Sequence, residues 1–166
     1  LPYVLVPTTL MAMVDAAFGG KVGINLQSGK NLLGAFHTPK AVLVDTEFLR
    51  TLPIREFRQA LGEVVKIATI SSDMHFFNKL EFISTTSLDL TSDKESLNYL
   101  IEHSIRKKLH LVEQDWKEQN LDRLLNAGHA IAHTLETVFK YDHKYLPHGN
   151  AVAIGLATCA RFSNSM

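Results

Sequence analysis

The sequence predicts an α/β segment over residues 1–53 that is followed by an all-α segment over residues 54–166. Two short apolar runs in the first segment, residues 3–6 and 41–45, have the length and the flanking residues of buried strands. Beyond Pro53 the apolar residues recur at intervals of three and four, which is typical of helices that bury one face. We therefore place a domain boundary after residue 53.

The composition is that of an ordinary globular protein. Of its 166 residues, 46% are hydrophobic and 20% are charged, and 17 Lys and Arg balance 17 Asp and Glu. This balance predicts no nucleic-acid partner and no acidic membrane surface as a partner. No apolar run approaches the roughly 18 residues of a membrane span. Because the chain opens inside an apolar run at Leu1, we expect it to be a segment of a longer protein.

The single cysteine, Cys159, excludes an internal disulfide and is compatible with a reducing cytoplasm. It lies in the apolar run 151–160, where we expect a buried, unreactive thiol. The cysteine content therefore favours a cytoplasmic protein.

In the first segment, Thr8 and Thr9 precede a predicted helix over residues 10–18. A threonine there is a good helix cap, and it also leaves hydroxyl and amide groups near a possible ligand. Two Gly-Lys pairs follow, at residues 20–21 and 29–30, and combine backbone freedom with a cation, as anion-binding loops require. Neither pair has the Walker A spacing. Residues 46–52 predict a short helix that Pro53 ends.

The second segment predicts helices over residues 54–70, 73–82, 95–115, 121–139 and 149–165, with a polar loop over 84–93. In the first of these helices, Glu63 lies at the margin of the apolar face and Lys66 on its exposed side. An exposed ion pair between them is the ordinary interpretation. The basic run 106–108 is likewise expected to be solvated.

One face of the helix that begins at residue 121 carries a polar stripe. Its members can ligate metal, accept protons or donate hydrogen bonds, and they are Asp122, Asn126, His129, His133 and Glu136. The opposite face is apolar and comprises Leu124, Ile131, Leu135, Val138 and Phe139. A solvated face of an amphipathic helix would give the same pattern.

Glu63, His129 and His148 together offer one carboxylate and two imidazoles, which is the ligand set of a catalytic zinc with an open fourth position. A structural zinc site would instead be closed by four ligands rich in cysteine. His133, one turn after His129, could be a fourth ligand or a proton-transferring group. The three ligands form no local motif.

Many dispersed blocks of the chain closely resemble 3-dehydroquinate synthase and the related sugar phosphate cyclases. In order, they are Val6-Pro7-Thr8-Thr9-Leu10, Val14-Asp15, Gly19-Gly20-Lys21 with Gly23-Ile24-Asn25, Gly29-Lys30-Asn31-Leu32, Gly34-Ala35-Phe36, Thr51-Leu52-Pro53, Glu63-Val64-Val65-Lys66, Leu124-Leu125-Asn126 with Gly128-His129, and His148-Gly149 with Ala151-Val152-Ala153-Ile154-Gly155. The resemblance spans nearly the whole chain and corresponds to the middle of a family member.

This resemblance implies the end of a Rossmann-like NAD-binding α/β domain joined to an all-α metal-binding domain, with the active site between them. The implied ligands of Zn²⁺ or Co²⁺ are Glu63, His129 and His148. The implied NAD contacts are Thr8, Thr9, Lys21, Lys30, Phe48, Leu49, Arg50 and Thr51. The implied substrate and catalytic residues are Asp15, Lys21, Asn31, Lys66, Lys108, Asn126 and His133. Lys108 is chosen over Lys107 because Ser104 and Asp115 fix the register of that helix.

The resemblance also implies the reaction. A seven-carbon keto-acid phosphate, 3-deoxy-D-arabino-heptulosonate 7-phosphate, becomes 3-dehydroquinate in the shikimate pathway. NAD oxidises an alcohol, phosphate is eliminated, the ketone is reduced again, and an aldol step closes the ring. The metal acts as a Lewis acid, and lysines and asparagines hold the phosphate and the carboxylate. The resemblance further implies a homodimer.

Several positions depart from the family pattern. Asp122 stands where the family usually has an arginine that helps to hold the substrate carboxylate, and Arg123 points about 100° away from the stripe. This departure raises the alternative of a 2-deoxy-scyllo-inosose or 2-epi-5-epi-valiolone synthase, which cyclise neutral sugar phosphates. Further departures are Val22, Ala130, Ala132 and Asn150. Gly19-Gly20-Lys21 and His133 favour the dehydroquinate enzyme.

Two rival interpretations lie outside this group of enzymes. A non-catalytic metal- or nucleotide-binding module is one, but all three metal ligands and the four lysines of the implied site are retained. An iron-type alcohol dehydrogenase is the other. Its usual ligands are an aspartate and three histidines, which fit the glutamate-led set less well.

Overall fold

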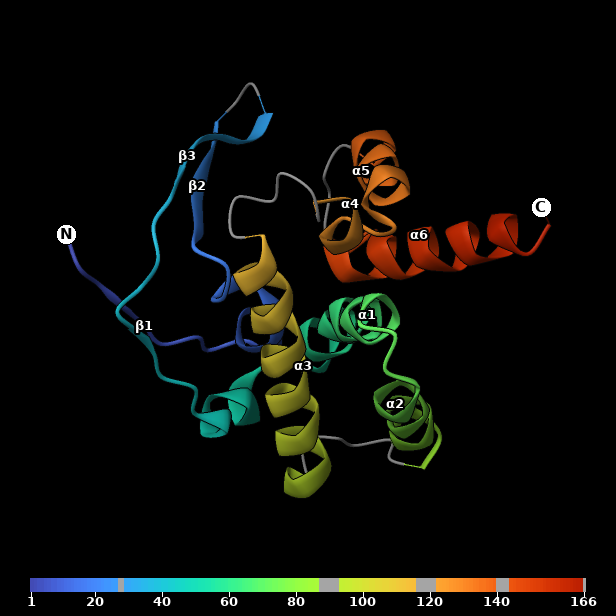
Figure 1. Cartoon of the computed structure of the whole chain (residues 1–166), viewed down its shortest axis with the longest axis horizontal. Coiled ribbons are helices and arrows are strands. Elements are labelled where there is room, and N and C mark those ends of the chain that lie inside the picture. The colour runs from blue at the N-terminus through green and yellow to red at the C-terminus, as the bar shows by residue number, and fades with distance from the viewer. Residues whose placement is uncertain (27–28, 87–92, 116–121, 140–143, 166) are drawn as a thin grey trace.

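The computed structural model describes residues 1–26, 29–86, 93–115, 122–139 and 144–165 (Figure 1). Strand β1 (Val4–Leu5) pairs in parallel with β4 (Ala41–Val42), which confirms both predicted strands. They are less buried than expected, and Val4 is half-exposed. The paired residues Val4 and Ala41 are both exposed, so one face of this two-stranded part of the sheet is open to solvent among the described residues.

A β-hairpin occupies the region where two loops were predicted. Strand β2 (Lys21–Leu26) pairs antiparallel with β3 (Gly29–Phe36), so the loop prediction was wrong for these residues. Gly34 faces Gly23 across the hairpin, and a Cβ on Gly34 would lie 2.7 Å from the carbonyl oxygen of Val22. These glycines therefore allow close strand packing, and their low strand propensity conceals the hairpin in the sequence.

The helix predicted after the threonines is present and includes a short π-helix, η1 (Ala12–Ala16). The Thr9 hydroxyl accepts a hydrogen bond from the Ala12 N–H at 3.2 Å, which confirms the predicted cap. A 3₁₀-helix, η2 (Thr46–Thr51), matches the second short helix, and the Asp45 carboxylate accepts from the Glu47 N–H at 2.9 Å.

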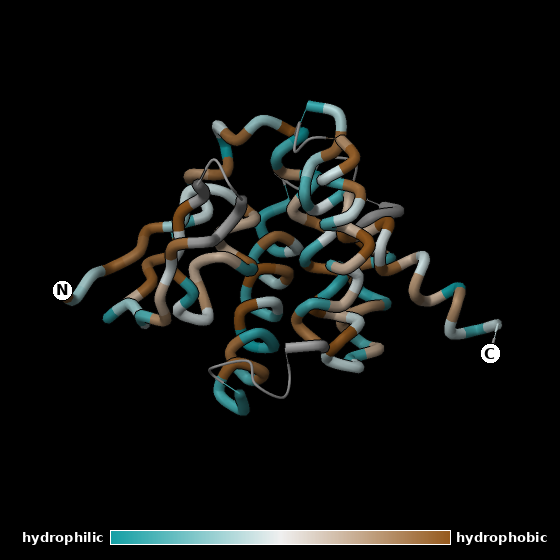
Figure 2. Tube along the Cα trace, turned by 90° about the horizontal axis from the view of Figure 1, so that it is seen from above, coloured by the Kyte–Doolittle hydropathy of each residue, from teal (hydrophilic) through white to brown (hydrophobic). Residues whose placement is uncertain are grey.

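Helices form the rest of the described chain: α1 (Ile54–Ile70), α2 (Met74–Thr86), α3 (Lys94–Gln114), α4 (Asp122–Leu125), α5 (His129–Val138) and α6 (His148–Ser163). The carboxylates of Asp73 and Asp93 cap α2 and α3. Helix α6 lies between α1 and α5 (Figure 1). In Figure 2 the helical tubes alternate between hydrophobic and hydrophilic stretches, as expected of helices with one buried face.

The main hydrophobic core joins the two segments. Leu10, Met13 and Val14 from the first helical turns pack with Phe57 of α1 and Phe76 of α2. Residues before and after residue 53 therefore pack in one hydrophobic core, and the domain boundary at that position stays a prediction.

The polar-stripe helix is interrupted, so its prediction as one continuous helix was wrong. Gly128 adopts a left-handed conformation (φ +76°) between α4 and α5. A Cβ on Gly128 would lie 2.8 Å from the backbone nitrogen of Leu156 and 3.0 Å from the carbonyl oxygen of Val152. The helix therefore breaks where the chain contacts α6, a contact that helical periodicity does not reveal.

The burial of α5 also differs from the expectation. Glu136, on the polar stripe, is only 1% exposed, whereas Val138, on the predicted apolar face, is 69% exposed. The buried side of α5 is the one that packs on α6 through Ala132 and faces the polar cluster described below.

Cys159 is exposed, which corrects the prediction of a buried thiol. None of the helices in the described ranges is both long enough and apolar enough to cross a membrane.

Candidate metal centre

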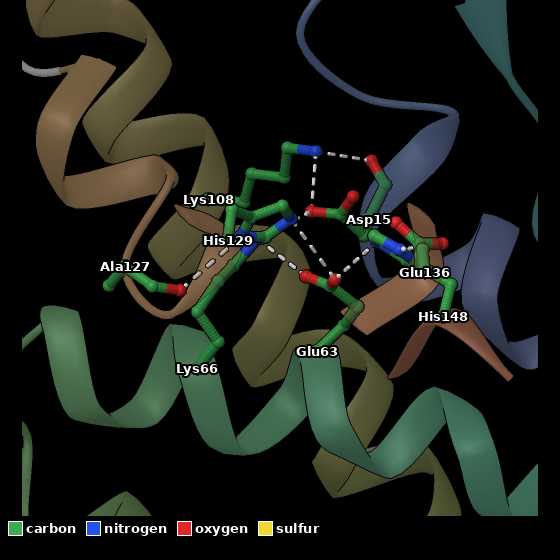
Figure 3. A network of polar contacts seen from close by, with 8 residues as sticks. All are labelled: Asp15, Glu63, Lys66, Lys108, Ala127, His129, Glu136 and His148. Carbon is green, nitrogen blue, oxygen red and sulfur yellow. Dashed lines mark hydrogen bonds and ion pairs between the residues drawn. The ribbon is translucent and has the colours of Figure 1, made fainter. Parts of the chain in front are cut away.

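Three polar side chains from three helices converge on one point (Figure 3). Glu63 comes from α1, His129 begins α5 and His148 begins α6. One ligand atom of each lies within 4.8 Å of the other two. Glu63 Oε1 lies 3.2 Å from His148 Nε2 and 3.6 Å from His129 Nε2. The structure thus brings together the three side chains that the sequence analysis assigned to a metal.

Glycine contacts set the positions of these side chains. Gly62, next to Glu63, touches Gly149, next to His148, where α1 crosses α6: a Cβ on either residue would overlap a backbone carbonyl group of the other helix. A Cβ on Gly155 of α6 would likewise overlap the carbonyl oxygen of Gly128, which precedes His129. Backbones in direct contact therefore fix all three ligand positions, because no intervening side chain can shift them.

Glu63 is a buried anion with a buried cationic partner. Its side chain is 1% exposed, and its Oε2 lies 2.5 Å from Nζ of Lys66, whose side chain is 4% exposed. This corrects the expectation that Lys66 is solvated: α6 and η1 both pack on α1, and Lys66 Nζ lies 3.9 Å from the carboxylate of Asp15 in η1. Burial opposes ionisation, but hydrogen bonding from His148 and the Lys66 charge outweigh it and lower the Glu63 pKa to about 2.

The surroundings shift the pKa values of the two histidines in opposite directions. Burial lowers the pKa of His129, and the nearby Lys66 charge lowers it further, so its ring is neutral at pH 7. Hydrogen bonding to Glu63 raises the pKa of His148 against its burial, and Glu136 adds to the effect. A positive charge between His148 and Glu63 is therefore favoured, and a metal ion can supply it in place of a proton.

The donor set fits a divalent metal. One carboxylate and two imidazoles within mutual reach match a zinc site that keeps a fourth position for substrate. His133 is exposed, and its ring centre lies 5.5 Å from that of His129 and 6.5 Å from that of His148. It lies outside the three-residue group, at its rim, where a proton-transferring group could meet a substrate.

A second ionic contact lies beside the first (Figure 3). Lys108 Nζ lies 2.6 Å from both the carboxylate and the carbonyl oxygen of Asp15, and Lys66 Nζ lies 3.9 Å from the same carboxylate. Lys108 is buried, which corrects the expectation of a solvated basic run. Of the two neighbouring lysines, Lys108 thus contacts Asp15, whereas Lys107 pairs with Asp73 at 2.7 Å.

The other predicted site residues lie in several places. Asn126 is exposed in the turn between α4 and α5, and Lys21 is exposed at the start of β2. Lys30 and Asn31 lie in strand β3, but their side chains are outside the described part of the structure. The side chain of Asp122 is also outside it.

The predicted NAD contacts are mostly at the surface. Thr8 is exposed and Thr9 half-buried at the start of the first helix. In η2, Phe48, Arg50 and Thr51 are exposed. Leu49 is 2% exposed and packs in the main core, so only its backbone is available to a ligand.

Sequence reasoning gave no role to Glu136, although it named this residue in the polar stripe. In the structure Glu136 Oε1 lies 3.2 Å from Nδ1 of His148. The available signal was its position two turns after His129 on the same helix face. The partner, twelve residues further along, could not be identified from spacing.

Two family models together match the entire chain. The model described as 3-dehydroquinate synthase N-terminal matches residues 1–59, and the one described as 3-dehydroquinate synthase C-terminal matches residues 60–166. Among curated relatives, the 3-dehydroquinate synthase of Picosynechococcus sp. is 44% identical over 99% of this chain and 44% of its own length. That of Prochlorococcus marinus is 48% identical over 94% of this chain and 42% of its own length. The chain thus spans less than half of these relatives.

Solved structures of two related enzymes share the fold. The 2-epi-5-epi-valiolone synthase of Streptomyces hygroscopicus, with NAD⁺ and Zn²⁺ bound, has a TM-score of 0.79 and 30% identity, over 94% of this chain and 42% of its own. A 2-deoxy-scyllo-inosose synthase, complexed with carbaglucose-6-phosphate, NAD⁺ and Co²⁺, has a TM-score of 0.82 and 28% identity, over 100% of this chain and 44% of its own.

Proposed function

This chain belongs to the 3-dehydroquinate synthase family, and we propose that the protein carrying it converts 3-deoxy-D-arabino-heptulosonate 7-phosphate into 3-dehydroquinate and phosphate. The product would enter the shikimate pathway toward aromatic amino acids. The observation that carries the proposal is the convergence of Glu63, His129 and His148 beside the buried lysines Lys66 and Lys108. The identity of 43–48% to curated 3-dehydroquinate synthases supports it.

In this proposal Glu63, His129 and His148 hold Zn²⁺ or Co²⁺. The ionised Glu63 and the neutral His129 are already in the forms that ligate a metal. The bound ion would act as a Lewis acid toward the hydroxyl and carbonyl oxygens of the substrate. That the related valiolone and inosose synthases bind Zn²⁺ and Co²⁺ supports the assignment.

The charges around the site suit an anionic substrate. Lys66 and Lys108 face the carboxylates of Glu63 and Asp15, and Glu136 adds a third carboxylate. With a divalent ion in place, positive charge exceeds negative charge by one, which favours binding of a phosphate or a carboxylate. The two lysines would hold these groups in place and Asn126 would donate hydrogen bonds. The exposed ring of His133 would accept or donate a proton at an imidazole nitrogen.

The first segment would bind NAD. The Thr8 hydroxyl and the Lys21 ammonium lie on exposed elements, which suits a large, anionic dinucleotide, and Thr9, Lys30 and residues 48–51 complete the proposed contacts. Bound NAD would supply a reversible oxidation of one substrate alcohol, with no net redox change. Asp15, Lys21 and Asn31 would then orient the substrate between the two segments.

A related cyclase is the second candidate, and the identity of residue 122 favours it. An aspartate there, in place of the usual arginine, removes a partner for the substrate carboxylate. Three similar solved structures are also those of inosose and valiolone synthases. The higher identity to the dehydroquinate enzymes, and the retained Gly19-Gly20-Lys21 and His133, favour the first candidate.

A comparison of three substrates tests the proposal. Phosphate release by the full-length protein, with NAD and Zn²⁺ present, is measured with the heptulosonate 7-phosphate, glucose 6-phosphate and sedoheptulose 7-phosphate. We expect release only from the heptulosonate. Release from glucose 6-phosphate would indicate an inosose synthase, and release from sedoheptulose 7-phosphate a valiolone synthase.

The same proposal includes a division into domains at residues 1–53 and 54–166. It is supported by the element order, since the described strands all precede Pro53 and helices α1 to α6 all follow it. It also includes a cytoplasmic homodimer. The dimer is supported by family membership alone, and the location by the single cysteine. Light scattering of the full-length protein would measure the oligomeric state.

A further inference from the structure

The ring of His148 lies between two carboxylates. Its Nε2 is 3.2 Å from Glu63 Oε1, on the side of the metal site, and its Nδ1 is 3.2 Å from Glu136 Oε1, on the opposite side (Figure 3). Glu136 is 1% exposed, while the side chain of His148 is 32% exposed. The buried carboxylate of Glu136 can therefore hold the ring on the side away from the metal site.

The position of the N–H on this ring decides whether it can bind a metal. A neutral imidazole carries one N–H and one lone pair. When Nδ1 carries the N–H and donates it to Glu136, the lone pair of Nε2 points toward Glu63 and the metal position. In the other tautomer an N–H points there and prevents coordination. When a metal ion occupies the position between Nε2 and Glu63, a carboxylate next to Nδ1 keeps the remaining N–H on that nitrogen. The charge of this carboxylate also makes Nε2 a stronger electron-pair donor to the metal.

His129 shows the same arrangement with a weaker partner. Its Nδ1 lies 3.3 Å from the carbonyl oxygen of Ala127, while its Nε2 faces Glu63. Both histidines thus present Nε2 to the site and Nδ1 to an oxygen acceptor. The repetition on two helices indicates that Glu136 orients His148 as the Ala127 carbonyl orients His129.

The packing of α5 on α6 makes this contact possible. Ala132 of α5 packs with Ala151 and Val152 of α6, and all three are buried. This contact of small side chains keeps the two helices close, so the buried glutamate one turn after Ala132 reaches the first residue of α6. The arrangement also explains why the buried side of α5 is its polar stripe.

We propose that Glu136 is a positioning residue that fixes the orientation and the tautomer of His148 for metal binding. The inference rests on the proposed metal site. It assigns to Glu136 no contact with the substrate and none with the metal itself.

Metal affinity of the full-length protein tests the inference. Zn²⁺ affinity is measured by competition with a chelator, and the absorption spectrum is recorded after loading with Co²⁺. Loss of such a partner weakens metal binding by about 10- to 100-fold. We expect about 100-fold weaker binding in Glu136→Ala and about tenfold in Glu136→Gln, whose amide oxygen can still accept the N–H. The Co²⁺ spectrum should change in the alanine variant and be largely restored in the glutamine variant.

Two controls separate the possible outcomes. Glu113→Gln makes the same chemical change at an exposed position of α3 and should leave Zn²⁺ affinity unchanged. Glu63→Ala should abolish binding, and stoichiometric zinc in that variant would overturn the metal site itself. Wild-type affinity in both Glu136 variants, with binding lost in Glu63→Ala, would overturn only the role of Glu136. If Glu136→Ala does not fold, unchanged affinity in Glu136→Gln is sufficient to overturn it.

Discussion

Lys66 Nζ lies 2.5 Å from Glu63 Oε2, and both side chains are almost completely buried. A buried ion pair stabilises little relative to apolar residues, but removal of one partner leaves an uncompensated charge. Lys66 also lies 3.9 Å from Asp15, so it links the metal-site carboxylate to the first helical turns. This cation is therefore central to the charge balance of the site.

Replacement of Lys66 should destabilise the metal-free protein strongly. For Lys66→Met we expect a loss of about 3–5 kcal/mol in the free energy of unfolding, measured with urea in the presence of a chelator. Lys94→Met breaks the exposed pair with Glu47, at 2.7 Å, and should cost no more than about 1 kcal/mol. Equal losses in the two variants would contradict the importance of burial.

The helix crossing at Gly62 should not tolerate a side chain. In Gly62→Ala the added Cβ would overlap the carbonyl oxygen of Gly149, so α1 and α6 must separate. We expect a loss of about 3 kcal/mol in stability, together with weaker Zn²⁺ binding. Thr69→Ala, at an exposed position of the same helix, should change stability by less than about 1 kcal/mol. A Gly62→Ala protein with wild-type stability and affinity would show that the crossing is not tight.

Loss of a ligand should remove the metal. Glu63→Ala and His148→Ala should each abolish tightly bound zinc, measured by elemental analysis of the full-length protein after dialysis. His75→Ala, an exposed histidine on α2, should retain it. Stoichiometric zinc in both ligand variants would refute the assignment.

Acid should destabilise the metal-free protein through Glu63. Against its burial, His148 and Lys66 lower the Glu63 pKa from 4.5 to about 2 on folding. The stabilisation that the ionised Glu63 adds to the free energy of unfolding is therefore complete above pH 4.5. It is lost as the pH falls toward 2, because the unfolded chain takes up the proton first. Relative to Glu63→Gln, the wild type should lose about 3 kcal/mol over this window. Urea unfolding of both proteins between pH 2 and pH 7 would measure this loss. The same pH dependence of the free energy of unfolding in wild type and Glu63→Gln would contradict the prediction.

Activity should distinguish Lys108 from its neighbour. Lys108→Ala removes a buried cation 2.6 Å from Asp15, and we expect kcat/KM of the full-length enzyme to fall by about 100-fold or more, the effect of losing one charged hydrogen bond. Lys107→Ala breaks a partly exposed pair with Asp73 and should change kcat/KM by less than about fivefold. Similar losses in both variants would place the substrate elsewhere.

The sequence by itself determined much of the fold. The limits of α1, α3 and α6 followed from apolar periodicity, and the cap at Thr9 followed from a local hydrogen bond that spans three residues. The grouping of Glu63, His129 and His148 followed from their chemistry and from the resemblance to a family, and the structure places them together.

Tertiary structure alone decided the hairpin of β2 and β3, the break at Gly128 and the burial of Lys66 and Lys108. It also decided the contact between Glu136 and His148. The low strand propensity of its glycines conceals the hairpin, and the helical features share one physical reason. Periodicity reports which side of one helix is apolar, whereas these features depend on which other segment lies against that side, and at this site α6 turns a polar face of α5 and of α1 into the interior.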